Sequence, residues 1–181
     1  MKSHVQVYLF ALSIAIAGCS RQPASPGSSE TPVATTPAVP AITVTATPSA
    51  GRGAERVFEI KALTRPGTGL PSLVGLLINS TMNGANGCYL YGAVANSKMM
   101  LVNDNGTGTK PLTGASIANN QCELVQDQSS VSASGSDVIV KAHVRFKPAF
   151  AGPKKLYVVA YDERQATDGL RPAGQWEVTA R

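Results

Sequence analysis

The amino-acid sequence predicts an all-β domain, an Ig-like β-sandwich of about eight or nine antiparallel strands with one disulfide. Three observations support this prediction. From residue 41 onward, short alternating or β-branched runs are separated by clusters of Gly, Pro, Asn, Asp and Ser. No window keeps the 3.6-residue period of an amphipathic helix. Two cysteines remain for a disulfide once Cys19, which directly follows the N-terminal leader, is set aside.

The first 18 residues are interpreted as a signal peptide, because Lys2 is followed by an apolar run from Val5 to Ala17 and then by small residues. The run is too short for a membrane span. The residues Ile16-Ala17-Gly18-Cys19 resemble the lipobox of bacterial lipoproteins, in which the chain is cut just before a Cys that carries a diacylglycerol. The resemblance implies that Cys19 is lipidated, with acyl chains such as palmitate.

Lipidation places the protein in the cell envelope. Several acyl chains on one Cys exceed the single chain that gives only marginal membrane binding, so a firm anchor is expected. In the lipoproteins that this leader resembles, an Asp after the lipidated Cys favours inner-membrane retention, so the resemblance with Ser20 at that position implies the outer membrane in a cell with two membranes. Residues 19–39 are interpreted as a tether, since Pro, Ser, Thr and Ala make up 14 of the 20 residues from Ser20 to Val39.

Residues 40–181 are expected to form the single folded domain, with nine strands separated by turns. The expected strands are 42–46, 56–63, 72–79, 88–94, 98–102, 122–126, 137–147, 154–162 and 175–179. Asn96-Ser97 suits a tight hairpin between two of them. Strand 137–147 alternates apolar and polar residues, which predicts one packed and one wet face.

Cys88 and Cys122 are expected to form the disulfide, because an exported domain lies in an oxidising compartment. The alternative is a reduced, buried pair. The bridge would close a loop of about 35 residues and stabilise the fold by roughly 4 kcal/mol on the chain-entropy estimate.

Five runs in this domain are distinctive: Asn86-Gly87-Cys88-Tyr89-Leu90-Tyr91, Leu101-Val102-Asn103-Asp104-Asn105-Gly106, Gln121-Cys122, Phe146-Lys147-Pro148-Ala149-Phe150-Ala151-Gly152 and Gly174-Gln175-Trp176. Together they resemble a β-sandwich module of secreted bacterial surface proteins. The resemblance implies a surface or envelope role and carries no activity with it.

The distribution of reactive side chains argues against an enzyme. Once the leader is cut, His143 is the single histidine, so neither a Ser-His-Asp triad nor a His-based metal site is expected. The carboxylates are scattered, and Asn103-Asp104-Asn105-Gly106 is better explained as a turn than as a Ca²⁺ loop. No metal or cofactor is expected. Nucleic acid is not expected either, because residues 41–181 carry 14 basic against 10 acidic residues and no recognition motif.

Two surfaces are candidates for binding. Lys141, His143, Arg145 and Lys147 form a basic row on the wet face of strand 137–147, which would attract anionic envelope polymers; the alternative is a solvated strand face. Tyrosines form the second candidate, since two of the expected strands each carry a pair on one face. These pairs are Tyr89 with Tyr91 and Tyr157 with Tyr161. They would stack sugar rings, or they simply pack in the core.

The sequence therefore predicts a lipid-anchored envelope module that binds or adheres without catalysis, with a glycan or an anionic polymer as ligand. The alternative is an accessory lipoprotein that docks an envelope protein partner. Exposed tyrosine rows would favour a glycan, whereas an exposed apolar strand edge would favour a protein partner that adds a strand.

Overall fold

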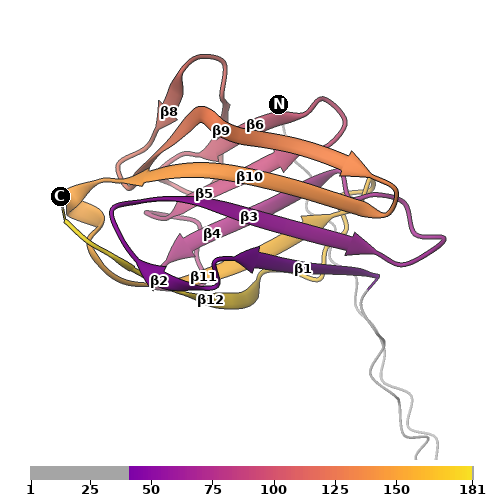
Figure 1. The fold of residues 1–181 in the computed structure, drawn as a ribbon, viewed down its shortest axis with the longest axis horizontal. Helices are drawn as coiled ribbons and strands as arrows, with labels where there is room; N and C mark the ends of the chain where they lie inside the picture. Colours follow the sequence, from indigo (N-terminus) through magenta and orange to yellow (C-terminus); the bar gives the residue numbers. More distant parts are fainter. Residues whose placement is uncertain (1–40, 181) are drawn as a thin grey trace, which may run out of the picture. The chain divides into compact units, whose positions relative to one another are not determined.

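The computed structural model describes residues 41–180, which form twelve strands and one short 3₁₀ helix, η1 (Pro148–Phe150), in two packed sheets (Figure 1). The expected signal peptide, the lipidated Cys19 and the tether lie outside the described residues.

The first sheet has five strands, all antiparallel to their neighbours. Its order is β1 (Ile42–Thr47), β3 (Glu55–Thr64), β10 (Asp137–Phe146), β9 (Cys122–Ser134) and β8 (Ser116–Ala118). Figure 1 shows β1 at one edge of this sheet, beside β3.

The second sheet has seven strands. Its order is β2 (Ala50–Arg52), β12 (Arg171–Val178), β11 (Gly152–Tyr161), β4 (Leu73–Asn79), β5 (Cys88–Ala93), β6 (Lys98–Val102) and β7 (Thr109–Pro111). Neighbours are antiparallel except β2 and β12, which pair in parallel.

The all-β sandwich with one disulfide is confirmed, and each of the nine expected strands is present. Three further strands, β2, β7 and β8, were not expected because each has only three residues. β9 is longer than expected and runs on to Ser134, since its Ser- and Gln-rich second half lacks the apolar alternation that marks a strand. The pairing is also not wholly antiparallel, because of β2 and β12.

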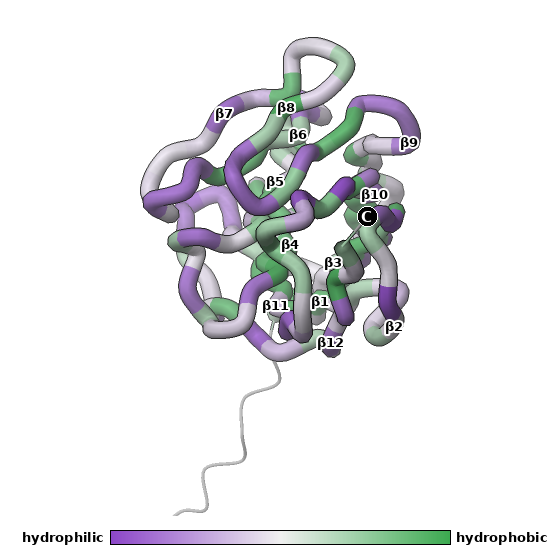
Figure 2. The backbone as a smooth tube through the Cα atoms, turned by 90° about the vertical axis from the view of Figure 1, so that its left-hand side faces the viewer, coloured by the Kyte–Doolittle hydropathy of each residue, from purple (hydrophilic) through white to green (hydrophobic). Residues whose placement is uncertain are grey.

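The main core lies between the two sheets, where Figure 2 shows hydrophobic segments of β3 and β4 toward the middle of the sandwich. Aromatic rings fill one part of it. The Phe58 ring packs edge-on against Trp176 and Phe146, with ring centres 5.3 and 6.4 Å apart. The Trp176 indole nitrogen donates to the Gly53 carbonyl at 3.0 Å, so its one polar group is satisfied.

The disulfide joins the two sheets. Cys88 at the start of β5 is bonded to Cys122 at the start of β9, and both residues are fully buried. Asn119 fastens the same region, because its side-chain amide donates to the carbonyls of Gly87 and Val102, each at 3.0 Å. The predicted bridge is therefore present, and side-chain hydrogen bonds support it.

Candidate functional site

The free edge of β1 is the most open backbone surface of the described domain. The Arg65 amide donates to the Ala41 carbonyl at 3.1 Å, and the register pairs Ile42 with Thr64. Because residues of an antiparallel strand alternate in the direction of their amide groups, those of Ile42, Val44 and Ala46 point away from β3. No other described strand pairs with β1. Three N–H donors and three C=O acceptors therefore face outward.

The other sheet edges within residues 41–180 are less open. β2, β7 and β8 have three residues each, and β7 contains Lys110 and Pro111. The second half of β9 lacks an outer neighbour, but an irregularity in the β9–β10 register precedes it. Short length, Pro, Lys and bulges are the usual protections of an edge strand, and β1 has none of them within its six uncharged residues.

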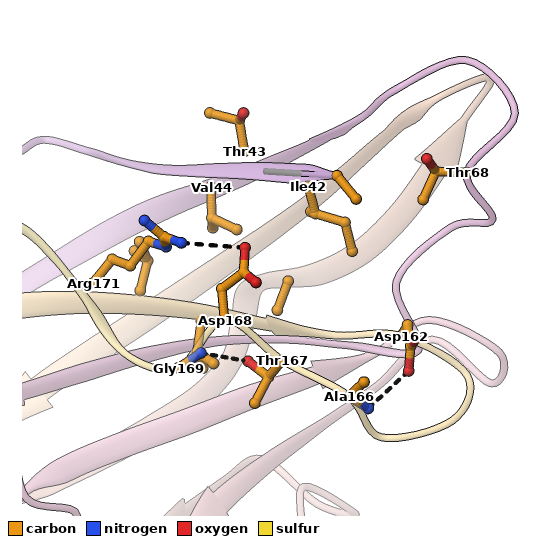
Figure 3. Close-up of a pocket in the computed structure, with 14 residues that line it drawn as sticks. Ile42, Thr43, Val44, Thr68, Asp162, Ala166, Thr167, Asp168, Gly169 and Arg171 are labelled. Atoms are coloured by element: carbon orange, nitrogen blue, oxygen red, sulfur yellow. Dashed lines mark hydrogen bonds and ion pairs between the residues drawn. The ribbon is translucent and has the colours of Figure 1, made fainter. Parts of the chain in front are cut away.

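An apolar pocket of about 350 Å³ lies beside this edge, in the seam between the two sheets. Ile42 and Val44 form one wall and are half-buried. Val158 and Ala160 of β11, whose side chains belong to the main core, contribute to the pocket as well. Figure 3 shows Ile42 and Val44 pointing into the pocket, while Thr43 points away from it. The same two residues thus present outward amides and apolar side chains.

The opposite wall is the loop between β11 and β12, which is held by its own hydrogen bonds. Asp162 Oδ1 accepts from the amides of Arg164 and Ala166, both at 2.8 Å. Asp168 and Arg171 form an ion pair at 3.2 Å on the rim, where both side chains are more than half exposed (Figure 3). The wall is therefore ordered before any ligand arrives.

The arrangement is suited to strand addition. An extended segment beside β1 would satisfy the outward amides, and every second side chain would enter the apolar pocket. The described part of the seam presents outward backbone groups beside apolar side chains, an arrangement suited to recognition of an extended segment.

The tyrosines lie together, but they are not an exposed platform. Tyr89, Tyr91, Tyr157 and Tyr161 share the outer face of the seven-stranded sheet, and the centres of the Tyr89 and Tyr91 rings are 4.6 Å apart. Only 7%, 9% and 4% of Tyr89, Tyr91 and Tyr157 is exposed, and Tyr161 is half-buried. With Leu77, Val102 and Val159 they form a second hydrophobic cluster. The expected sugar-stacking face is corrected to a packed cluster.

Burial also governs the electrostatics of this cluster. Loss of solvent raises the pKa values of the Tyr89 and Tyr91 hydroxyls well above their ordinary value. For Tyr89 the hydrogen bond to Tyr91 opposes the rise, while for Tyr91 the bond to Tyr89 adds to it. Both phenols are neutral at physiological pH.

The basic row is largely neutralised by carboxylates on the neighbouring strands. Lys141 lies 3.9 Å from Glu59, and Arg145 bonds Glu55 at 3.0 Å and approaches Glu123 at 3.9 Å. Lys147 lies exposed beyond the end of β10. The sequence placed these residues on one face, but β3 and β9 bring acidic partners that the linear pattern does not reveal. The row is an ion-pair ladder rather than a free cationic strip.

His143 is buried, contrary to the expectation of a surface residue, with 5% of it exposed. Its Nε2 lies 2.6 Å from Glu55 Oε1 and its Nδ1 2.9 Å from the Asp127 carbonyl. The hydroxyl of nearby Ser129 instead donates to the Val125 carbonyl and accepts from the His143 amide. The ring therefore fastens the irregular part of β9 to β10 through the Asp127 carbonyl.

The turn at Asn103-Asp104-Asn105-Gly106 uses its oxygens within the protein. Asn103 Oδ1 accepts from the amides of Thr107 and Gly108, and Asp104 Oδ1 accepts from the amide of Asn120.

Across residues 41–180 no three His, Cys, Asp or Glu side chains are grouped as metal ligands. The same residues include no helix long and apolar enough to cross a membrane.

The chain matches no family model and no curated protein. The candidate site therefore depends on geometry alone. Sequence reasoning located strand 42–46 but did not identify it as the edge of the open seam. Two features of the sequence could have indicated an edge strand here. They are the flanking prolines, Pro40 and Pro48, and the lack of charged residues between them.

Proposed function

We propose that this protein is a lipid-anchored, non-catalytic module of a bacterial cell envelope that docks a protein partner as an added strand along β1. The observation that carries the proposal is the edge at Ile42, Val44 and Ala46, with which no strand within residues 41–180 pairs, beside an apolar pocket of about 350 Å³. The lipobox at Cys19 supports the anchor and, with Ser20, an outer-membrane location.

Recognition of a glycan or an anionic polymer has less support. Three of the four tyrosines are buried and Tyr161 is half-buried, so the cluster offers little ring face to stack on a sugar. The basic row faces Glu55, Glu59 and Glu123, which removes most of its attraction for a polyanion.

The docking test uses a labelled peptide with the sequence of residues 41–47 and the full chain. Val44→Pro removes an amide that faces outward while leaving the β1–β3 hydrogen bonds in place, which is the position where an edge strand tolerates Pro. Val44→Ala is the matched control, because it shortens the side chain but keeps the amide. We expect saturable binding to the unmodified chain and to Val44→Ala, and loss of binding in Val44→Pro. Equal binding to Val44→Pro would refute docking at this edge.

The anchor is tested separately with Cys19→Ala. We expect the variant to leave the membrane fraction after a salt wash, whereas the unmodified chain stays. Retention of the variant in the membrane would exclude a lipid on Cys19 as the anchor.

A further inference from the structure

The edge of β1 is complementary to itself. Its outward amide groups belong to Ile42, Val44 and Ala46, so they are centred on Val44. A two-fold axis at Val44 would place Val44 opposite the Val44 of a second copy, and Ile42 opposite its Ala46. In that arrangement all three donors and all three acceptors of each copy are paired.

We infer that the partner docked along β1 is a second copy of this chain, joined by antiparallel pairing of the two β1 strands about Val44. The inference rests on the proposed function, because it names the partner that the edge takes. It makes an isologous dimer, in which the same patch of both copies forms the contact. The two five-stranded sheets then become one continuous sheet.

The length and charge of β1 favour a second copy over an unrelated strand. Pro40 and Pro48 lack an amide hydrogen, so pairing is limited to residues 41–47, and a second copy has the same limits. β1 itself is uncharged, so no like charges on the two strands meet across the axis. Thr43 and Thr45 are exposed on the outer face of the sheet and would face the Thr45 and Thr43 of the second copy.

A charge-swap experiment tests this register. Two versions of the full chain, each with a different epitope tag, are coexpressed and solubilised in mild detergent. The chains are purified through one tag, and the co-purified chains are detected through the other. We expect unmodified copies to co-purify. Thr43→Lys with Thr45→Lys in both copies puts two like-charge pairs across the axis. The amount of co-purified chain should then fall about tenfold. Thr43→Glu with Thr45→Glu in both copies should have the same effect, because it also puts two like-charge pairs across the axis. A Lys-bearing copy mixed with a Glu-bearing copy should recover the lost pairing.

The control variant places the same charges on the other free edge. Ser132→Lys with Ser134→Lys on β9 uses exposed positions and should leave recovery unchanged. Lys61 of β3 lies opposite Thr45, so a charge at position 45 can change the stability of each copy. The melting temperature of every variant is therefore measured, which separates an effect on folding from an effect on pairing of the two copies. Equal recovery for all charge combinations would overturn the inference, since shared micelles alone would produce it.

The two proposals fail in different ways. If unmodified copies do not co-purify while the labelled peptide still binds the β1 edge, the second-copy inference is wrong and docking by strand addition stands. If neither the second copy nor the peptide binds, both proposals are wrong.

Discussion

The ring of Tyr91 lies directly over Gly75 on the adjacent strand β4. The two residues are cross-strand partners, and a Cβ atom on Gly75 would come within 2.7 Å of Tyr91 Cδ1 and Cε1. The missing side chain therefore gives the tyrosine its place on the sheet. The ring then packs against Tyr89, and its centre is 6.1 Å from that of Tyr161. The outer cluster depends on this contact.

Gly75→Ala should destabilise the domain by about 1–3 kcal/mol, because the added methyl group displaces the Tyr91 ring. The measurement is the free energy of unfolding in denaturant. In a Tyr91→Leu background the same substitution should cost less, since the obstructing ring is gone. An equal cost in both backgrounds would show that the ring is not the cause.

The tyrosine cluster should make the protein sensitive to alkaline pH. Burial raises the pKa values of Tyr89 and Tyr91, so the folded state keeps protons that the unfolded chain loses above its ordinary tyrosine pKa of about 10. Stability is thus fully present below about pH 10 and is lost as the pH rises further. The double variant Tyr89→Phe, Tyr91→Phe should lose less stability than the unmodified chain between pH 9 and 11. Parallel stability curves for the two proteins would contradict this assignment.

The sequence was sufficient to predict the fold class because strand patterns and the cysteine count are local properties. It was also sufficient to place Tyr89 with Tyr91 and Tyr157 with Tyr161 on shared faces. It did not reveal that both pairs lie on one buried face, because that depends on β11 and β5 both pairing with β4.

The same limit applies to the candidate site. The strand at residues 42–46 was predicted from its residues, but its place at an open edge follows from the order of strands in the sheet. His143 was placed on the outer face of its strand by alternation. Its burial depends on Glu55, 88 residues earlier in the chain, and on the irregular part of β9. Long-range pairing therefore determines what the local pattern leaves open.

Removal of the disulfide should be costly. Cys88 and Cys122 are 34 residues apart in the sequence, and closing a loop of that size stabilises a fold by about 4 kcal/mol on the chain-entropy estimate. Cys88→Ala with Cys122→Ala should lower the unfolding free energy by this order, measured without reductant. Reductant should destabilise the unmodified chain and leave the double variant unchanged. A double variant as stable as the unmodified chain would mean that the partly buried hydrogen bonds of Asn119 suffice to hold this region.

His143 should matter for stability, because its buried ring contacts two partly buried groups, one through each nitrogen. His143→Phe keeps a ring in place but removes both nitrogen contacts, so the Asp127 carbonyl and Glu55 each lose a partner. The expected loss is about 1–3 kcal/mol of unfolding free energy. Lys141→Ala, on the same face of β10, is the matched control and should change stability by less than about 1 kcal/mol, because its pair with Glu59 is solvent-exposed.

The effect of His143 should also be local, since the ring fastens the irregular part of β9 to β10. In His143→Phe, amide hydrogen exchange should increase over residues 126–130, while the amides of β4 stay protected. Uniform loss of protection across both sheets would instead mean that His143 supports the whole core, and the assignment of a fastening role to its ring would then be wrong.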